Sequence, residues 1–290
     1  MIATTWPTPG NPDAIDTDGQ FLQWTTAPFQ MWWAASHPGR PVIATPRPVF
    51  RERAGDLPVA DPPVDALKHL LARIAAAEER SSRPRGSVGL IAVSKTRTVA
   101  EILSLAGRGQ RRFGENYLQE ALPKIAALQG QLLEWHFIGT VQTNKSGLIA
   151  RHFSFVHTVD REKVAAALDA HRPAGRPPLD VCIQVNIGGE PSKSGVALTD
   201  LPALAEAVVG YPRLRLRGLM ALPAPGRDFD GQRAGFRPLA AALNDLRGRG
   251  HALDTLSIGT SEDFEAAIFE GATLMRVGTA LFGPRGVRAR

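Results

Sequence analysis

The stretch VGLIAVSKTRTVAEILSLA, residues 88–106, decides the fold class of this chain. It opens with the apolar run Val88–Val93, which has the length and composition of a buried strand. A polar turn, Ser94-Lys95-Thr96, follows. The apolar residues of Val99–Ala106 then recur at the spacing of an amphipathic helix. The stretch therefore predicts a strand, a turn and a helix, in that order.

This unit recurs along the chain, and each repetition takes roughly 25 residues. The predicted strands are Val88–Val93, Arg112–Gly114, Trp135–Ile138, Phe153–Val159, Leu179–Asn186, Leu214–Met220, Thr255–Ile258 and Leu274–Val277. The helices predicted between them are Val99–Ala106, Tyr117–Leu128, Asn144–Ala150, Arg161–His171, Leu201–Val209, Gly231–Arg247 and Glu262–Glu270. An amphipathic helix beginning at Pro63 precedes them. Alternation on this scale predicts an α/β protein, a (β/α)8 TIM barrel of parallel strands.

A doubly wound open sheet has the same alternation of strands and helices and stays open as an alternative. The first predicted strand is not followed by G-x-G-x-x-G, so the phosphate-binding turn of a dinucleotide-binding domain is missing. The glycine pattern therefore favours the barrel.

Residues 1–60 differ in composition from the rest of the chain. They contain four of the five tryptophans, Trp6, Trp24, Trp32 and Trp33, among Pro, Gly and Thr, with neither helical nor strand periodicity. We expect a disordered or irregular N-terminal extension over residues 1–60, or a misassigned start, and a barrel domain over residues 61–290. The alternative is a docking segment built around Met31-Trp32-Trp33.

The overall composition is that of an ordinary globular protein, with 43% hydrophobic and 21% charged residues. No apolar stretch approaches the roughly 18 to 20 residues of a membrane span. Cys182 is the single cysteine, which excludes a disulfide framework, and the first basic residue is Arg40, so a charged secretory leader is missing. We therefore expect a cytoplasmic protein without a membrane partner.

The charge balance is basic, with 34 Lys and Arg against 28 Asp and Glu, and this raises the question of nucleic acid. The arginines are scattered, and no basic patch interleaved with aromatic residues accompanies them. We expect no nucleic-acid partner.

In a parallel barrel the active site is built from polar residues at the carboxyl ends of the strands. Lys95 follows the first strand and would project into the barrel mouth. A desolvated lysine loses its proton readily and is a nucleophile near neutral pH, as a Schiff base to an aldehyde requires. The alternative is a lysine whose ammonium reaches solvent at the strand end. The remaining lysines, Lys68, Lys124, Lys145, Lys163 and Lys193, fit helix surfaces or polar turns.

A second group of polar residues follows strands seven and eight, where phosphate sites of these barrels recur. The group is Ser257-Ile258-Gly259-Thr260-Ser261 and Arg276-Val277-Gly278-Thr279. Ser261 also has the character of an N-cap for the helix Glu262–Glu270, which is compatible with phosphate binding because both use free backbone amides. Gly278 would let a ligand approach the backbone closely.

Several motifs resemble those of the pyridoxal phosphate (PLP) homeostasis proteins, relatives of the N-terminal barrel of alanine racemase. They are Ala92-Val93-Ser94-Lys95-Thr96, Phe113-Gly114-Glu115-Asn116-Tyr117, Trp135-His136-Phe137-Ile138-Gly139, Gln142-Thr143-Asn144-Lys145, His157-Thr158-Val159-Asp160, Gln184-Val185-Asn186-Ile187, Ser192-Lys193-Ser194-Gly195, Arg217-Gly218-Leu219-Met220 and Arg276-Val277-Gly278-Thr279-Ala280. The resemblance extends over roughly residues 63 to 284 and implies the barrel of fold type III PLP proteins.

The resemblance further implies that pyridoxal 5'-phosphate is held as a Schiff base on Lys95, in a monomeric or weakly associating barrel. Ser261, Gly278 and Thr279 would hold the phosphate, and Asn116 would face the oxygen side of the ring. Arg276 would face the pyridine nitrogen and disfavour its protonation, which weakens the ring as an electron sink. Asn186, Met220 and His136 would line the pocket, and Lys145 and Lys193 are either aids to cofactor movement or solvent-facing lysines.

A racemase needs an acid/base group on each face of the substrate carbon. Alanine racemase takes the second group from a tyrosine of another domain, whereas this chain contains only Tyr117 and Tyr211. We therefore expect a protein that carries or buffers PLP in vitamin B6 homeostasis, acts indirectly on amino- and keto-acid metabolism, and delivers the cofactor to apo PLP-dependent enzymes. The alternative is an amino-acid racemase or another weak PLP-dependent enzyme.

Overall fold

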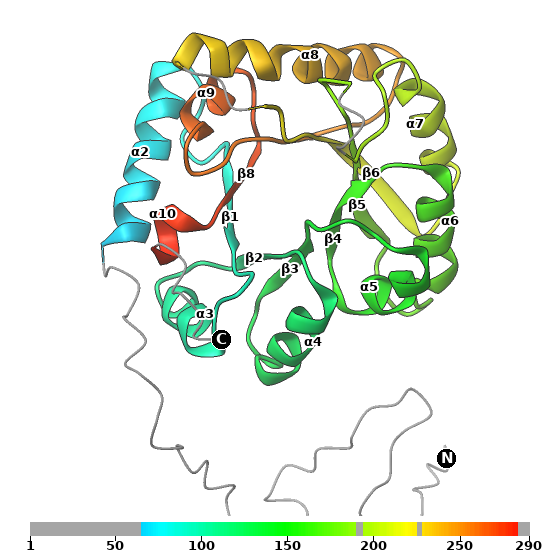
Figure 1. Cartoon of the computed structure of the whole chain (residues 1–290), viewed down its shortest axis with the longest axis horizontal. Helices are drawn as coiled ribbons and strands as arrows, with labels where there is room; N and C mark the ends of the chain where they lie inside the picture. Colours follow the sequence, from blue (N-terminus) through cyan, green and yellow to red (C-terminus); the bar gives the residue numbers. More distant parts are fainter. Residues whose placement is uncertain (1–64, 190–193, 225–227, 284–290) are drawn as a thin grey trace, which may run out of the picture. The chain divides into compact units, whose positions relative to one another are not determined.

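The eight strands form a closed parallel barrel surrounded by helices (Figure 1). The computed structural model describes residues 65–189, 194–224 and 228–283. Strand β1 pairs with β8 as well as with β2, and the β1–β8 register joins four residue pairs, from Gly89 with Leu274 to Ala92 with Val277. This closure confirms the predicted barrel and rules out the open sheet. The N-terminal extension and Lys193 lie outside the described residues.

The strands agree with the predicted ones to within two residues at each end. They are β1 Gly89–Val93, β2 Arg112–Glu115, β3 Glu134–Phe137, β4 Phe155–Val159, β5 Leu179–Gln184, β6 Leu214–Met220, β7 Thr255–Ser257 and β8 Leu274–Val277.

A helix follows each strand, as a parallel barrel requires. The helices are α2 Ala66–Arg80, α3 Val99–Gly107, α4 Leu118–Ala127, α5 Ser146–His152, α6 Glu162–His171, α7 Leu201–Val209, α8 Phe229–Gly248, α9 Phe264–Phe269 and α10 Thr279–Phe282, with a short 3-10 turn η1 Thr143–Lys145 before α5. Helix α10 is an addition to the sequence prediction. Its single turn is too short to show a periodic pattern.

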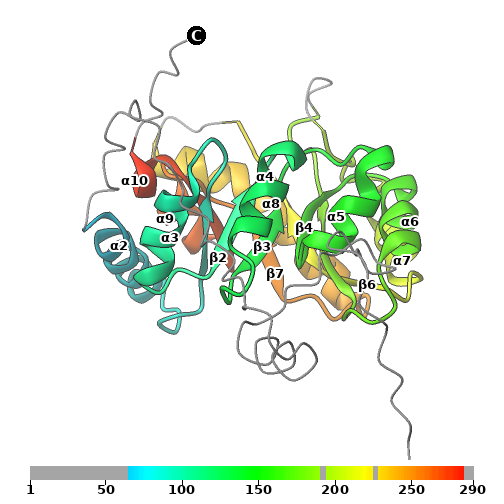
Figure 2. The ribbon, with the colours of Figure 1, turned by 90° about the horizontal axis from the view of Figure 1, so that it is seen from below.

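The hydrophobic core lies mainly between the strands and the helices. Figure 2 views the barrel from the side, across α3, α4 and α5, with the strands behind them. Helix α3 illustrates the packing: Ile102 and Leu105 are buried against the strands, and Thr98 and Glu101 close a capping box that begins the helix. A smaller cluster, Phe155, Cys182 and Met220, belongs to the interior of the barrel.

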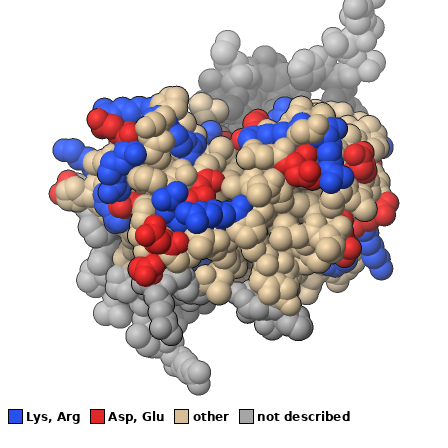
Figure 3. All heavy atoms as spheres, turned by 90° about the horizontal axis from the view of Figure 1, so that it is seen from above, with Lys and Arg blue, Asp and Glu red and all other residues tan. Residues whose placement is uncertain are grey.

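Charged side chains of opposite sign are interspersed on the face that carries α2, α8 and α9 (Figure 3). Arg73 of α2 pairs with Glu265 of α9 at 2.9 Å, and Arg233 of α8 pairs with Glu270 at 2.6 Å. Within the described part of the chain, no helix is long and apolar enough to cross a membrane.

Candidate functional site

Lys95 lies where the sequence predicts, just beyond the carboxyl end of β1, and it is half-buried. The turn that follows it is conformationally strained, because Thr96 has a φ of 65°, which β-branched residues rarely adopt. The backbone N–H of Thr96 donates to Glu120 Oε2 at 2.9 Å, and Arg97 N donates to the Ser94 carbonyl at 3.0 Å. These two hydrogen bonds fix the backbone conformation of the residues that follow Lys95.

A buried polar network joins the ends of β1 and β2 from outside the barrel. Glu115 Oε1 accepts from Ser94 Oγ at 2.6 Å and from Lys124 Nζ at 2.8 Å, and Lys124 Nζ also donates to the Ser94 carbonyl at 2.8 Å. Burial raises the pKa of Glu115, against the lowering contributions of Lys124 and Ser94. The network fixes the residues directly before Lys95 and Asn116.

The prediction that Lys124 is an ordinary helix-surface lysine is wrong. Its side chain is only 10% exposed, because it reaches inward along α4 to the carboxylate of Glu115. Amphipathic periodicity cannot distinguish a lysine that reaches solvent from one that reaches back to a buried partner.

Asn116 follows β2 and supplies a polar atom that has no partner among the described residues. Its Oδ1 is buried and accepts no hydrogen bond within that part of the chain. Buried amide oxygens are nearly always paired, so the unpaired Oδ1 at this strand end leaves a hydrogen-bond acceptor for a bound molecule. An amide also offers N–H donors, which suit the oxygen side of a pyridoxal ring.

Gly139 positions Asn116 from the neighbouring strand end. A Cβ added at Gly139 would lie 2.0 Å from the carbonyl oxygen of Asn116. Only a shift of the backbone could relieve this steric clash. The tight approach of the two loops therefore requires glycine here.

We expect Gly139→Ala to displace Asn116 and to weaken PLP binding about tenfold, with a loss of about 1–3 kcal/mol in the free energy of unfolding. Spectral titration with PLP and urea denaturation measure the two effects. Gly107→Ala is the matched control, because an added Cβ there meets nothing within 4 Å. Equal PLP affinity in Gly139→Ala and wild type would contradict this role.

Arg276 of β8 is buried and holds a fixed orientation. Nη1 donates to the carbonyl oxygen of Ser257 at 2.7 Å and to its Oγ at 2.6 Å, and Nη2 donates to the Ala221 carbonyl at 3.0 Å. Burial lowers the pKa of Arg276 to about 10, so the guanidinium is charged at neutral pH. These three bonds use three of its five N–H groups, and the other two can serve a ligand.

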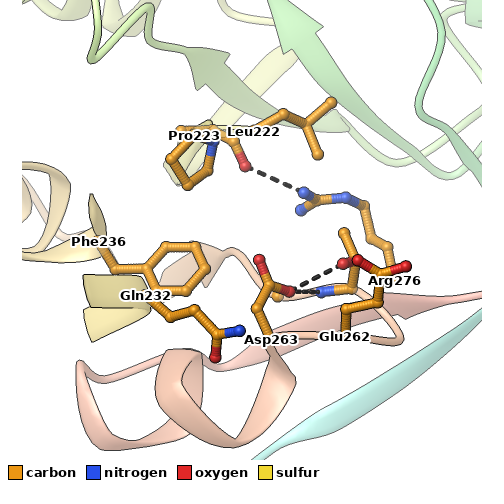
Figure 4. Close-up of a pocket in the computed structure, with 10 residues that line it drawn as sticks. Leu222, Pro223, Gln232, Phe236, Glu262, Asp263 and Arg276 are labelled. Carbon is orange, nitrogen blue, oxygen red and sulfur yellow. Dashed lines mark hydrogen bonds between the residues drawn. The ribbon is translucent and has the colours of Figure 1, made fainter. Parts of the chain in front are cut away.

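A cavity of about 160 Å³ lies beside Arg276, where β6, β7 and β8 end. Figure 4 shows Arg276 and Asp263 reaching into it, with Phe236 and Gln232 approaching from α8. The cavity thus combines a guanidinium, a carboxylate and an aromatic wall at the mouth predicted for the site.

The loops after β7 and β8 meet at Ser261, as a shared phosphate site requires. Ala280 N, in the first turn of α10, donates to Ser261 Oγ at 3.4 Å. Thr279 begins α10 and is exposed, and thus Ser261 and Thr279, two of the three residues predicted to hold the phosphate, border the same loop junction. An added Cβ at Gly278 would meet Val93 at 3.4 Å, so packing alone does not demand a glycine there.

Ser261 does not cap the following helix, contrary to the prediction. Helix α9 begins at Phe264 rather than Glu262, with Asp263 in the N-cap position. The Asp263 carboxylate instead accepts from Thr260 N at 2.6 Å and from Thr260 Oγ1 at 2.8 Å. Serine and aspartate are both good caps, and the loop geometry that chooses between them is not visible in the sequence.

The remaining predicted residues take different places. Asn186 follows β5, where Gly195 packs so closely that an added Cβ would lie 2.6 Å from the Asn186 nitrogen. Met220 is buried in the barrel interior against Phe155 and Cys182. His136 is fully buried and lines a cavity at the amino-terminal mouth, so its predicted place in the cofactor pocket is wrong.

Sequence reasoning overlooked a line of polar side chains inside the barrel, formed by Glu134, His136, His157 and Ser257. Glu134 and His136 belong to β3, His157 belongs to β4 and Ser257 belongs to β7. Two histidines and a serine within buried strands are the signal that should have been noted.

Known proteins resemble this chain over the barrel. The alanine racemase N-terminal domain family matches residues 65–286. A pyridoxal phosphate homeostasis protein of Pseudomonas aeruginosa is 56% identical over 219 residues, covering 76% of this chain and 94% of that protein. The homonymous protein of Escherichia coli K12 is 50% identical over 217 residues, covering 73% and 92%. The structure of PipY from Synechococcus elongatus PCC7942 with PLP bound is 35% identical, has a TM-score of 0.65, and covers 74% of this chain and 100% of PipY.

Proposed function

This chain belongs to the family of pyridoxal phosphate homeostasis proteins, within the alanine racemase N-terminal domain family, and we propose that it carries or buffers PLP bound as a Schiff base to Lys95. The observation that carries the proposal is the half-buried Lys95 at the same barrel mouth as Asn116 and Arg276. A solved relative has PLP bound, which supports the same cofactor here.

Each part of the cofactor has a complementary group at this mouth. The aldehyde of PLP reacts with a lysine amine, and Lys95 is the amine at the end of β1. The amide of Asn116 has N–H donors for the ring oxygen, and Ser261 with Gly278 and Thr279 borders a junction suited to the phosphate. Asn186 and Met220 complete the walls of the proposed site.

Arg276 favours a carrier over an efficient enzyme. When PLP is bound, its ring supplies an electron sink, and that sink is strongest when the pyridine nitrogen is protonated. A charged guanidinium facing the nitrogen opposes that protonation. Neither tyrosine is placed to act as the second acid/base group of a racemase. Tyr117 is 54% exposed, and the Tyr211 hydroxyl donates to Glu162 of α6, in the outer helix layer.

We expect Arg276→Gln to raise the dissociation constant for PLP about tenfold and to shift the absorption band of bound PLP, because a charge-assisted hydrogen bond to the ring is lost. Titration followed by absorption measures both quantities. Arg237→Gln on α8 is the control, because that arginine is 56% exposed and pairs only with Glu270 among the described residues. An unaltered absorption spectrum and PLP affinity in Arg276→Gln would contradict the proposal that Arg276 contacts the pyridine ring.

The decisive experiment for the carrier role compares turnover with delivery. The loaded protein should racemise alanine or serine well below one turnover per second, the lower range of ordinary enzymes. It should also restore activity to an apo PLP-dependent enzyme. Turnover at one per second or faster would instead establish the racemase alternative. We further propose a cytoplasmic monomer, which light scattering of the purified chain and cell fractionation test.

A further inference from the structure

Polar side chains connect across the interior of the barrel from Arg276 to Glu134. Arg276 Nη1 lies 2.6 Å from Ser257 Oγ, and Ser257 Oγ lies 2.9 Å from His157 Nδ1. His157 Nε2 lies 2.9 Å from His136 Nδ1. His136 Nε2 lies 3.2 Å from Glu134 Oε1, within ion-pair distance but without the geometry of a hydrogen bond. Because β4 and β7 are not neighbours, the His157–Ser257 bond passes through the barrel interior.

The side chains in the middle of this series are buried from solvent, and Glu134 at its end is charged. His136, His157 and Ser257 are fully buried, and the Phe155 ring stacks on both imidazoles. Burial lowers the pKa of His136, and lowers that of His157 well below its ordinary value, so both rings are neutral. The contact with His136 lowers the pKa of Glu134 to about 2, so its carboxylate is ionised. The other charged groups that act on the rings are Arg112, Asp180 and Arg276.

Arg276 and Glu134, at the two ends of this series of side chains, together indicate where the protons between them lie. The Glu134 carboxylate faces His136 Nε2 and favours a proton on that nitrogen, so Nδ1 of the neutral ring accepts from His157 Nε2. Neutral His157 then accepts at Nδ1, and the donor there is the hydroxyl of Ser257. The lone pair left on Ser257 Oγ accepts from Arg276, which only donates. Each hydrogen bond between Arg276 and His136 therefore points in the direction of Glu134.

We propose that Ser257, His157 and His136 are positioning residues that form a hydrogen-bond relay, polarised at its far end by the Glu134 carboxylate, and orient Arg276 from beneath. Arg276 makes no ion pair within the described ranges, and its three bonds all go to neutral oxygens. Through the relay, the negative charge of the Glu134 carboxylate polarises the hydrogen bonds that lead to the Arg276 guanidinium on the opposite side of the barrel. Aligned hydrogen bonds of this kind polarise one another in a low dielectric.

The relay also links the two mouths of the barrel. The side chain of Glu134 is 39% exposed, it accepts from Arg112 Nε at 3.1 Å, and both line the cavity at the amino-terminal mouth. The part of the inference that concerns the cofactor rests on the proposed function, because Arg276 is taken to face the pyridine nitrogen. The proton positions do not depend on that premise.

Nitrogen NMR of the cofactor-free protein, labelled at histidine, tests the relay directly. Assignment uses the variants His136→Gln and His157→Asn. We expect both rings to be neutral at pH 7, protonated at Nε2 and unprotonated at Nδ1. A proton on Nδ1 of either ring, or a cationic imidazole, overturns the proposal. Because no PLP is present, this outcome stands apart from any failure of cofactor binding.

Glu134→Gln tests the transmission of charge. The amide removes the acceptor-only end, so we expect a mixture of tautomers at His136 and about a fivefold faster loss of PLP from the loaded protein. Asp254→Asn is the matched control, because it removes one negative charge at the same mouth of the barrel. Asp254 pairs with Arg217 and lies outside the relay. Unchanged tautomers in Glu134→Gln, or equal effects in both variants, would refute the relay.

Discussion

A chain with Lys95 replaced by alanine takes up no PLP that borohydride can trap, whereas the wild type is labelled at that residue. The Schiff base requires a primary amine, and the proposed amine is the one at the end of β1. The free energy of unfolding should change by no more than about 1 kcal/mol, because the side chain is half-buried at the mouth and not part of the packed core. Absorption before and after borohydride, peptide mass mapping and urea denaturation make the measurement.

Lys163→Ala provides the matched control, because Lys163 is an exposed lysine of α6. It should retain the wild-type absorption band and the label at Lys95. A Lys95→Ala protein that keeps the imine band would place the cofactor on another lysine. A wild-type protein that stays colourless with PLP would show that the barrel has lost its ligand.

The second large effect concerns stability. Lys124→Ala should lower the free energy of unfolding by about 3 kcal/mol, because it leaves the fully buried Glu115 carboxylate without its cation. Ser94 remains as a donor to Glu115, but a neutral hydroxyl compensates a buried charge less well. Urea denaturation at several pH values measures the loss, and Lys68→Ala on the exposed face of α2 is the control.

The loss in Lys124→Ala should depend on pH with a defined sign. Burial already raises the pKa of Glu115 above 4.5, and removal of Lys124 withdraws two influences that lower it. A carboxyl group whose pKa is higher in the folded state favours folding at low pH, and this contribution disappears as the pH rises through the folded pKa. The deficit should therefore be larger at pH 8 than at pH 5. A deficit independent of pH would indicate lost packing rather than an uncompensated charge.

The local pattern of the sequence was sufficient for the order and the bounds of the strands. The predicted strands Leu214–Met220 and Leu274–Val277 coincide with β6 and β8, because short runs of mostly apolar residues are typical of strands even where an arginine interrupts them. The position of Lys95 could also be predicted, since the residue after such a run necessarily lies at the carboxyl mouth of a parallel barrel. These inferences depend only on neighbours in the chain.

The partners of the polar side chains were decided by the tertiary structure alone. Lys124 pairs with Glu115 through the packing of α4 on β2, and His157 meets Ser257 from 100 residues away across the barrel. His136 turned out to belong to the relay rather than to the cofactor pocket. The chain sequence determines which residues share a strand or a helix, because periodicity is local. Which buried donor finds which acceptor depends on the closure of the sheet, because only closure brings distant strands within hydrogen-bonding distance.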